Sequence, residues 1–202
     1  MPNWCSNSVA FYQKNKGTTM LEAFYADIQK YQNYKDPETS NSSSWVGHWL
    51  ESNRIDTKNL YARGFFNHCE LSDDHVRIDM ETAWGPLPEI WDLMADKYDL
   101  AYVYISQEPG CEVYVNTDIV GMYFSTRYQL NYFEIENLDV DARTLAAHDD
   151  LLQKICEETM YFDSWEEVVD IFKPLVFEFE DIEVLNRRLE VLGISVYQYD
   201  YG

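Results

Sequence analysis

The 202-residue sequence predicts an α+β fold in which an antiparallel sheet packs against helices and an acidic, mainly helical C-terminal extension follows. Residues 76–81 alternate apolar and polar side chains, which is the period of a strand with one buried and one exposed face. Residues 87–98 instead place apolar side chains at helical spacing, so a helix should follow that strand. After Tyr132, acidic residues and helical patterns dominate. We therefore expect a domain at 1–132 and an extension at 133–202 that packs on it.

The first part of the chain predicts a strand, a helix and a second strand, as in a split β-α-β unit. Thr19 followed by Glu22 resembles a capping box and indicates where the first helix begins. A polar, serine-rich segment then introduces a loop and short-helix insertion at about 34–59. The expected elements are a strand at 7–14, a helix to about residue 33, a loop at 34–44, a short helix at 45–50 and a strand at 60–71.

The middle of the chain completes a β-α-β-β-α-β order with both helices on one face. Gly85-Pro86 ends the strand near Trp84 and begins a helix, because proline fits the first helical turn. A strand at 100–107 follows, and Pro109-Gly110 turns the chain back into 111–116. An added hairpin around 116–118 is expected from the alternation of Val113 and Val115, then Val120, Met122 and Phe124.

The extension predicts three helices and a closing strand. The first helix is indicated by Leu145, Leu152 and Ile155. Ser164 with Glu167 forms a second capping box, and Pro174 should stop the helix that follows it. Asp181 can cap a third helix that ends at Gly193, and residues 194–197 form the strand. The apolar stripes of these helices should pack on the sheet or form an oligomer contact.

Three short motifs resemble the YubB ferredoxin-like family of phage- and plasmid-encoded proteins. They are Met1-Pro2-Asn3-Trp4-Cys5-Ser6-Asn7, Glu81-Thr82-Ala83-Trp84-Gly85-Pro86 and Glu108-Pro109-Gly110. The resemblance covers about residues 1–130 and implies a ferredoxin-like antiparallel sandwich and a phage or mobile-element setting. It implies no activity and no catalytic residue.

Charge is the distinguishing global property of the chain. The formal net charge is −21, of which residues 70–118 carry −10 and residues 134–202 carry −13. So acidic a surface repels phosphate backbones, which disfavours direct nucleic-acid binding and favours a basic or nucleic-acid-binding protein as partner. A simpler interpretation, which is favoured for the charge alone, is that the acidic residues keep an aromatic-rich protein soluble. With neither a long apolar run nor a secretory signal, we expect a cytoplasmic protein without a membrane partner.

The sequence favours neither a metal site nor a cofactor nor an identifiable catalytic centre. His68, Cys69 and His75 form the one local cluster of metal-ligand types, but adjacent strand residues point to opposite faces. Cys111 is the most plausible reactive thiol because it lies at a turn, although packing at a strand start is the favoured interpretation. Residues 137–148 resemble half of a calcium loop but lack its glycine and its final glutamate.

The candidate binding residues are exposed carboxylates and tryptophans. Trp45 and Trp49 could form an aromatic patch beside a loop or fill the core, and core packing is the favoured interpretation. Trp84 could line a pocket at the strand–helix corner, although burial at that corner is favoured. The binding residues that we predict are Trp45, Trp49, Asp73, Asp74, Trp84, Glu157, Glu158, Glu166 and Glu167.

Two function classes follow from this sequence. The leading hypothesis is a non-enzymatic, phage-type accessory protein that binds a basic partner through its acidic surface. A more specific version of this hypothesis is that the protein mimics nucleic acid and inhibits a host defence protein. The alternative is a small enzyme with a thiol- or carboxylate-based site on the sheet.

Overall fold

The computed structural model describes residues 3–14, 20–32, 44–132, 160–174, 176 and 179–201. It divides into two compact units. Unit 1 comprises Met1–Ile119 with Tyr201–Gly202, and unit 2 comprises Val120–Asp200. The sequence predicts a boundary after residue 132, whereas the observed boundary lies after Ile119. The reason is that the strand that contains Tyr132 belongs to unit 2. The expected packing of the extension on the first domain stays a prediction.

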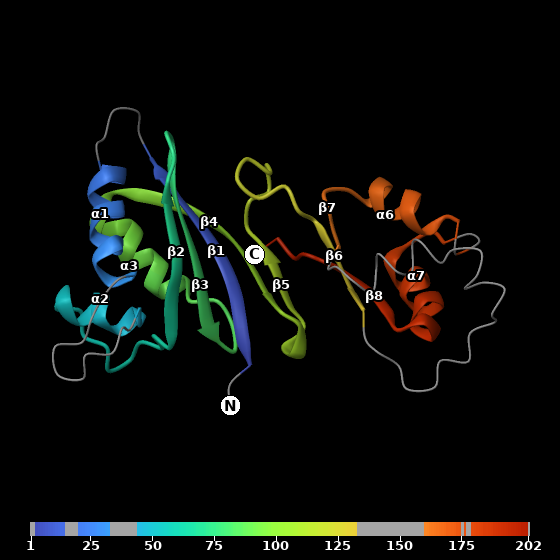
Figure 1. Ribbon diagram of the computed structural model, residues 1–202, viewed down its shortest axis with the longest axis horizontal. Helices are drawn as coiled ribbons and strands as arrows, with labels where there is room; N and C mark the ends of the chain where they lie inside the picture. Colours follow the sequence, from blue (N-terminus) through green and yellow to red (C-terminus); the bar gives the residue numbers. More distant parts are fainter. Residues whose placement is uncertain are drawn as a thin grey trace. The chain divides into compact units, whose positions relative to one another are not determined.

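Unit 1 contains a five-stranded antiparallel sheet with the strand order β2-β3-β1-β4-β5 (Figure 1). The strands are β1 (Trp4–Gln13), β2 (Gly64–Leu71), β3 (His75–Ala83), β4 (Leu100–Glu108) and β5 (Val113–Asn116). The helices are α1 (Met20–Gln32), α2 (Val46–Ser52) and α3 (Pro88–Tyr98), and a 3₁₀ turn, η1 (Pro109–Cys111), joins β4 to β5. The predicted α+β class is therefore confirmed.

Helices α1, α2 and α3 lie on the same side of this sheet (Figure 1). Alternate residues of the central strands face them, as the period of two requires, and Val9, Phe11, Ile78 and Met80 are buried there. The helices contribute large buried side chains to the same core, among them Trp91. Helical and strand periodicity in the sequence thus identify the faces that meet.

The exposed edge of β2 is closed by side chains of α1. Gln29 Nε2 donates to the Cys69 carbonyl at 3.3 Å, and Gln32 Nε2 donates to the Asn67 carbonyl at 3.0 Å. Nearer the start of the strand, the Phe66 amide donates to the Ser44 carbonyl at 2.9 Å. Edge strands offer unpaired backbone groups to other chains, and these contacts occupy that edge.

Unit 2 contains a three-stranded antiparallel sheet with the order β7-β6-β8. Its elements are β6 (Tyr128–Tyr132), β7 (Met160–Phe162), α6 (Trp165–Phe172), α7 (Ile182–Leu189), the 3₁₀ turn η2 (Glu190–Leu192) and β8 (Ile194–Gln198). Asn186 fixes α7 to β8, because its side-chain amide bonds both the N–H and the C=O of Val196 at 2.8 Å. Three residues of β7 are too few to produce a sequence signal, and this strand was not predicted.

The predicted hairpin over 113–124 is wrong in its second half. Residues 120–124 form no strand, and the side chain of Val120 is 83% exposed. Gly121 has a φ of +75°, which interrupts the pleat, and the Arg127 guanidinium bonds the carbonyls of Phe124 and Thr126. The next strand, β6, pairs with β7 and β8 and not with β5.

The helix signals of the extension are confirmed where the structure describes them. Ser164 accepts the Glu167 amide and Asp181 accepts the Val184 amide, so both predicted N-caps form. Gly193 has the left-handed φ of +69° expected at a helix end. The predicted helix around Leu145–Ile155 and the capping residue Thr19 lie outside the described residues.

No helix in the described part of the chain is long and apolar enough to cross a membrane.

Removing the cap of α7 tests how unit 2 is stabilised. Asp181→Ala should lower the free energy of unfolding by about 1 kcal/mol, because the Val184 amide loses its acceptor at the helix start. Asp181→Asn should stay close to the wild type, since asparagine caps equally well. Urea unfolding followed by circular dichroism measures both. Equal losses in the two variants would contradict a capping role.

Candidate functional site

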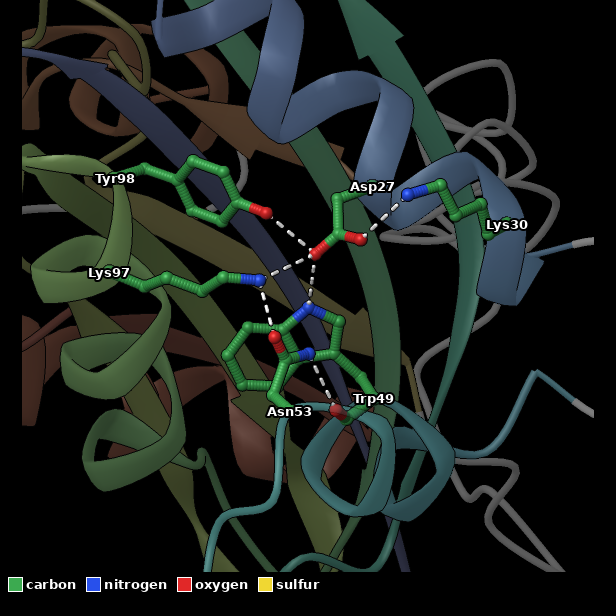
Figure 2. A network of polar contacts seen from close by, with 6 residues as sticks. All are labelled: Asp27, Lys30, Trp49, Asn53, Lys97 and Tyr98. Carbon is green, nitrogen blue, oxygen red and sulfur yellow. Dashed lines mark hydrogen bonds and ion pairs between the residues drawn. The ribbon is translucent and has the colours of Figure 1, made fainter.

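Three helices of unit 1 meet at the carboxylate of Asp27, which is 8% exposed on α1 (Figure 2). Asp27 Oδ2 accepts from Trp49 Nε1 of α2 at 3.0 Å and from Tyr98 OH of α3 at 2.7 Å. Lys97 Nζ, also on α3, lies 3.1 Å from the same oxygen. Lys30 Nζ donates to Oδ1 at 3.2 Å, and Lys97 also contacts Asn53. The cluster therefore fixes α1, α2 and α3 relative to one another.

Asp27 stays ionised because its partners outweigh its burial. Burial raises the pKa of the carboxyl group, but the hydrogen bonds from Tyr98, Lys97, Lys30 and Trp49 together hold it below the ordinary value of 3.8. In return, burial and the bond to Asp27 raise the pKa of the Tyr98 phenol. Every strong donor around this carboxylate is used within the protein, so we assign the cluster a structural role.

With its inner face held by Asp27, α3 presents an acidic ridge, which we define as Glu89, Asp92, Asp96 and Asp99. All four are exposed, whereas Ile90, Trp91, Met94 and Tyr98 of the same helix are buried. Glu89, Asp92 and Asp96 are three or four residues apart and so lie along one face of α3, and Asp99 follows as the left-handed C-cap at the end of the helix.

Few cations neutralise the acidic ridge. Among the described residues, one ion pair reaches it, from Lys14 Nζ to Asp99 Oδ1 at 3.9 Å, and an exposed pair at that distance contributes little. Asp92 Oδ1 accepts a hydrogen bond from Tyr102 OH at 2.8 Å, which keeps its charge in place without cancelling it. Residues 1–119 together carry nine Lys/Arg and eighteen Asp/Glu, a net charge of −9. The ridge thus adds to a negative unit.

The sequence did not identify the ridge as a binding surface. Its residues are recognisable as the polar face of a predicted helix, and that periodicity was the available signal. Asp73 and Asp74, which were predicted to bind, are exposed at the β2–β3 turn, where Asp74 bonds His75 Nδ1 at 2.8 Å. Glu166 and Glu167 are exposed on the first turn of α6 in unit 2. Glu157 and Glu158 lie outside the described residues.

The three predicted tryptophans have different environments. Trp49 is buried, which confirms the favoured interpretation of core packing. Trp84 is 50% exposed, so the expectation of a buried tryptophan at the strand–helix corner is wrong. Its φ of +71° turns the chain sharply after β3, and α3 begins only at Pro88. Trp45 is partly exposed.

Trp45 forms one wall of a groove of about 610 Å³ between α2 and the segment before β2. The indole covers Gly47 so closely that a Cβ atom there would lie 2.3 Å from the ring. Tyr61, Arg63 and Phe65 also line the groove. We call this feature the aromatic groove.

The aromatic groove continues onto the N-terminal strand through ring contacts. The rings of Phe65 and Trp4 lie 5.7 Å apart, and the Arg63 guanidinium lies 5.9 Å from the centre of the Trp4 ring. Trp4 is itself exposed. The groove and its rim therefore form a surface of exposed rings with one cation among them.

The thiol of Cys111 is exposed beside a buried carboxylate. Asn3 Nδ2 lies 3.7 Å from Cys111 Sγ, and Glu108 Oε1 accepts the Gly110 amide at 2.9 Å. A hydrogen bond to Glu108, with desolvation, raises the pKa of Cys111. Burial raises the pKa of Glu108, but its bonds to Cys111, Gly110 and Asn3 outweigh this effect and lower it. The pair therefore favours a carboxylate and a protonated thiol, the opposite of an activated nucleophile.

The remaining described cysteines are buried thiols. Desolvation raises the pKa of Cys5 and of Cys69 to about 12 in each case. His68 is exposed whereas Cys69 is buried on β2, so the two face opposite sides of the sheet. Among the described residues, no three His, Cys, Asp or Glu side chains gather as metal ligands.

No family model, curated protein or solved structure matches the chain.

Neutralising Asp27 tests the helix cluster and its pH dependence. Asp27→Asn should lower the free energy of unfolding by about 2 kcal/mol at pH 7, because charge-assisted hydrogen bonds are lost. The folded pKa of Asp27 lies below its unfolded value, so this stabilisation is present above about pH 4 and is lost as pH falls further.

Urea unfolding followed by tryptophan fluorescence between pH 7 and pH 3 measures the difference between wild type and variant. Asp96→Asn is the matched control, since Asp96 is exposed on α3. A difference for Asp27→Asn that stays constant over this pH range would contradict the assigned ionisation.

Removing the charge beside Cys111 tests the origin of its raised pKa. Glu108→Gln should lower the pKa of Cys111 and increase its rate of reaction with a disulfide reagent at pH 8 several-fold. Cys111→Ser reports how much of the measured reaction comes from other cysteines. An unchanged rate in Glu108→Gln would show that Glu108 does not hold the proton on the thiol.

Proposed function

We propose that the chain is a non-enzymatic protein-binding module that engages a basic partner through its acidic surface, with the acidic ridge of α3 at its centre. The observation that carries this proposal is the placement of Glu89, Asp92 and Asp96 along one exposed face of α3, with the exposed Asp99 at its C-cap. The Asp27 cluster supports it, because a helix fixed by Lys97 and Tyr98 presents its charges without a loss of order on binding. A net charge of −21 adds long-range attraction for a cationic protein.

Nucleic-acid mimicry is the sharper form of the same proposal. A row of carboxylates on a rigid helix offers a basic groove a substitute for a row of phosphates. Such a partner would be a nucleic-acid-binding protein, for example a host defence protein. Electrostatic steering would make association fast and dependent on salt.

The motifs that resemble the YubB family extend the proposal to fold and setting. We propose that unit 1 is a ferredoxin-like sandwich with an added edge strand. The support is that β2, β3, β1 and β4 are neighbours in that order and antiparallel, while β5 continues the sheet beside β4. In this proposal the chain is a cytoplasmic accessory protein of a phage or mobile element, and the C-terminal extension forms an oligomer contact.

The enzymatic alternative receives less support from the described residues. A thiol-based site needs a thiolate, and the pKa of Cys111 is raised. A carboxylate-based site needs an unengaged acid in a pocket, and Asp27 is fully occupied by donors from three helices.

Neutralising the ridge tests the proposed function. A triple variant, Glu89→Gln with Asp92→Asn and Asp96→Asn, should bind a labelled oligo-arginine peptide roughly tenfold more weakly, as expected for the loss of three exposed charges near a cation. The control, Glu70→Gln with Asp73→Asn and Asp74→Asn, removes the same charge around the β2–β3 turn and should retain most of the affinity. Fluorescence anisotropy over a series of salt concentrations measures both.

Two results would overturn the assignment. Equal weakening of the ridge variant and the turn variant would show that affinity follows net charge and not the ridge. Affinity that does not fall with salt would remove the electrostatic basis of binding. The mimicry proposal predicts that duplex DNA releases a protein that the wild type has captured from lysate. If DNA does not reduce the capture, the mimicry proposal is contradicted.

A further inference from the structure

Within the described part of unit 1, the cations that form no ion pair lie in one segment, residues 54–63. Among its described residues, Lys14, Lys30, Arg77 and Lys97 each form an ion pair with an aspartate. Arg54, Lys58 and Arg63 form none, although the chain carries 36 Asp/Glu. Even Glu81, which lies opposite Phe65 in the β2–β3 register, makes no ion pair with Arg63. Residues 54–63 therefore carry three cations and one carboxylate, Asp56, which is a net charge of +2 within an acidic protein.

This same segment forms the aromatic groove. Thr57, Tyr61 and Arg63 line it, with Lys58 adjacent to Thr57 in the sequence. Tyr61 is 50% exposed, and Arg63 is also exposed. A cavity of about 610 Å³ has the size of a site for a small ligand or for one or two large side chains. The groove thus combines apolar walls with a local charge opposite in sign to that of the whole protein.

A ligand at this groove must bind through side chains and not by adding a strand to the sheet. The neighbouring edge of β2 is already occupied, by the Ser44 carbonyl and by the amides of Gln29 and Gln32. Strand addition needs free backbone groups at an edge. Rings and guanidinium groups remain as the means of recognition.

We propose that the aromatic groove is a second binding surface. It binds an acidic peptide segment whose aromatic or aliphatic side chain inserts into the groove as an anchor. The anchor occupies the space lined by Trp45, Tyr61 and Phe65, and a carboxylate beside it binds Arg63. Lys58 and Arg54 attract the remaining acidic residues of the segment. This surface is distinct from the acidic ridge and prefers ligands of the opposite charge.

The charges favour a short acidic peptide over single-stranded nucleic acid. Aromatic rings with arginine also suit stacked bases, so nucleic acid is the natural competitor. A nucleic-acid strand, however, brings a continuous row of phosphates to a unit of net charge −9, where three cations are the local compensation. A peptide needs only one or two carboxylates next to its anchor side chain, and the cations at the groove can pair with these carboxylates.

Fluorescence anisotropy with the full chain tests the proposal. The probe is a fluorescein-labelled peptide with one tryptophan flanked on each side by two aspartates. Its basic counterpart carries lysines in place of the aspartates, and labelled oligothymidylate represents single-stranded nucleic acid. We expect saturable binding of the acidic peptide that weakens about tenfold in Arg63→Gln, the scale for loss of a charge-assisted hydrogen bond.

Two further variants identify the site. Tyr61→Ala removes a wall of the groove without changing charge and should weaken the acidic peptide as well. Arg77→Gln removes the same charge as Arg63→Gln, but Arg77 already pairs with Asp79 at 3.0 Å, so it should leave the affinity within about twofold.

The proposal is overturned if the acidic peptide shows no saturable binding, or if Arg63→Gln and Arg77→Gln behave alike. It is also overturned if oligothymidylate binds more tightly than the acidic peptide, because the groove would then be a nucleic-acid site. Binding of the basic peptide that is lost in the ridge variant but kept in Arg63→Gln would support two separate surfaces. The results with the acidic peptide and with oligothymidylate do not depend on the ridge being functional.

Discussion

The buried carboxylate of Asp27 is the constraint on which the helical layer of unit 1 depends. A carboxylate removed from water must be compensated by donors, and here they come from α2 and α3 as well as from α1 itself. None of the three helices can move independently without leaving a charge unpaired. The acidic ridge and the aromatic groove therefore share one fixed helical layer, because α3 carries the ridge and α2 begins at the wall of the groove.

Local sequence patterns predicted the parts of the fold that depend on near neighbours. The alternation through Val76, Ile78 and Met80 and the stripe of α3 were sufficient, since burial of one face follows directly from either period. The caps at Ser164 and Asp181 were equally local. The hairpin beyond Thr117 failed because alternation alone cannot reveal that Gly121 takes a left-handed conformation.

The site was less predictable because its contacts are long-range. Asp27 is separated by 22 positions from Trp49 and by 70 from Lys97, and nothing in either neighbourhood indicates the other. Trp84 was misjudged because its positive φ directs it away from the core, a conformation that tryptophan rarely adopts. The free cations near Tyr61 could be counted in the sequence, but the absence of ion partners is visible only in space.

The amide side chains along β2 have a consequence for the behaviour of the protein in solution. The net charge of −21 opposes self-association by repulsion, and this repulsion weakens as pH falls toward the isoelectric point. Gln29 and Gln32 do not titrate, so their cover of the Cys69 and Asn67 carbonyls persists when electrostatic repulsion has gone. Protection of these two carbonyls against pairing with another strand is therefore independent of acidity.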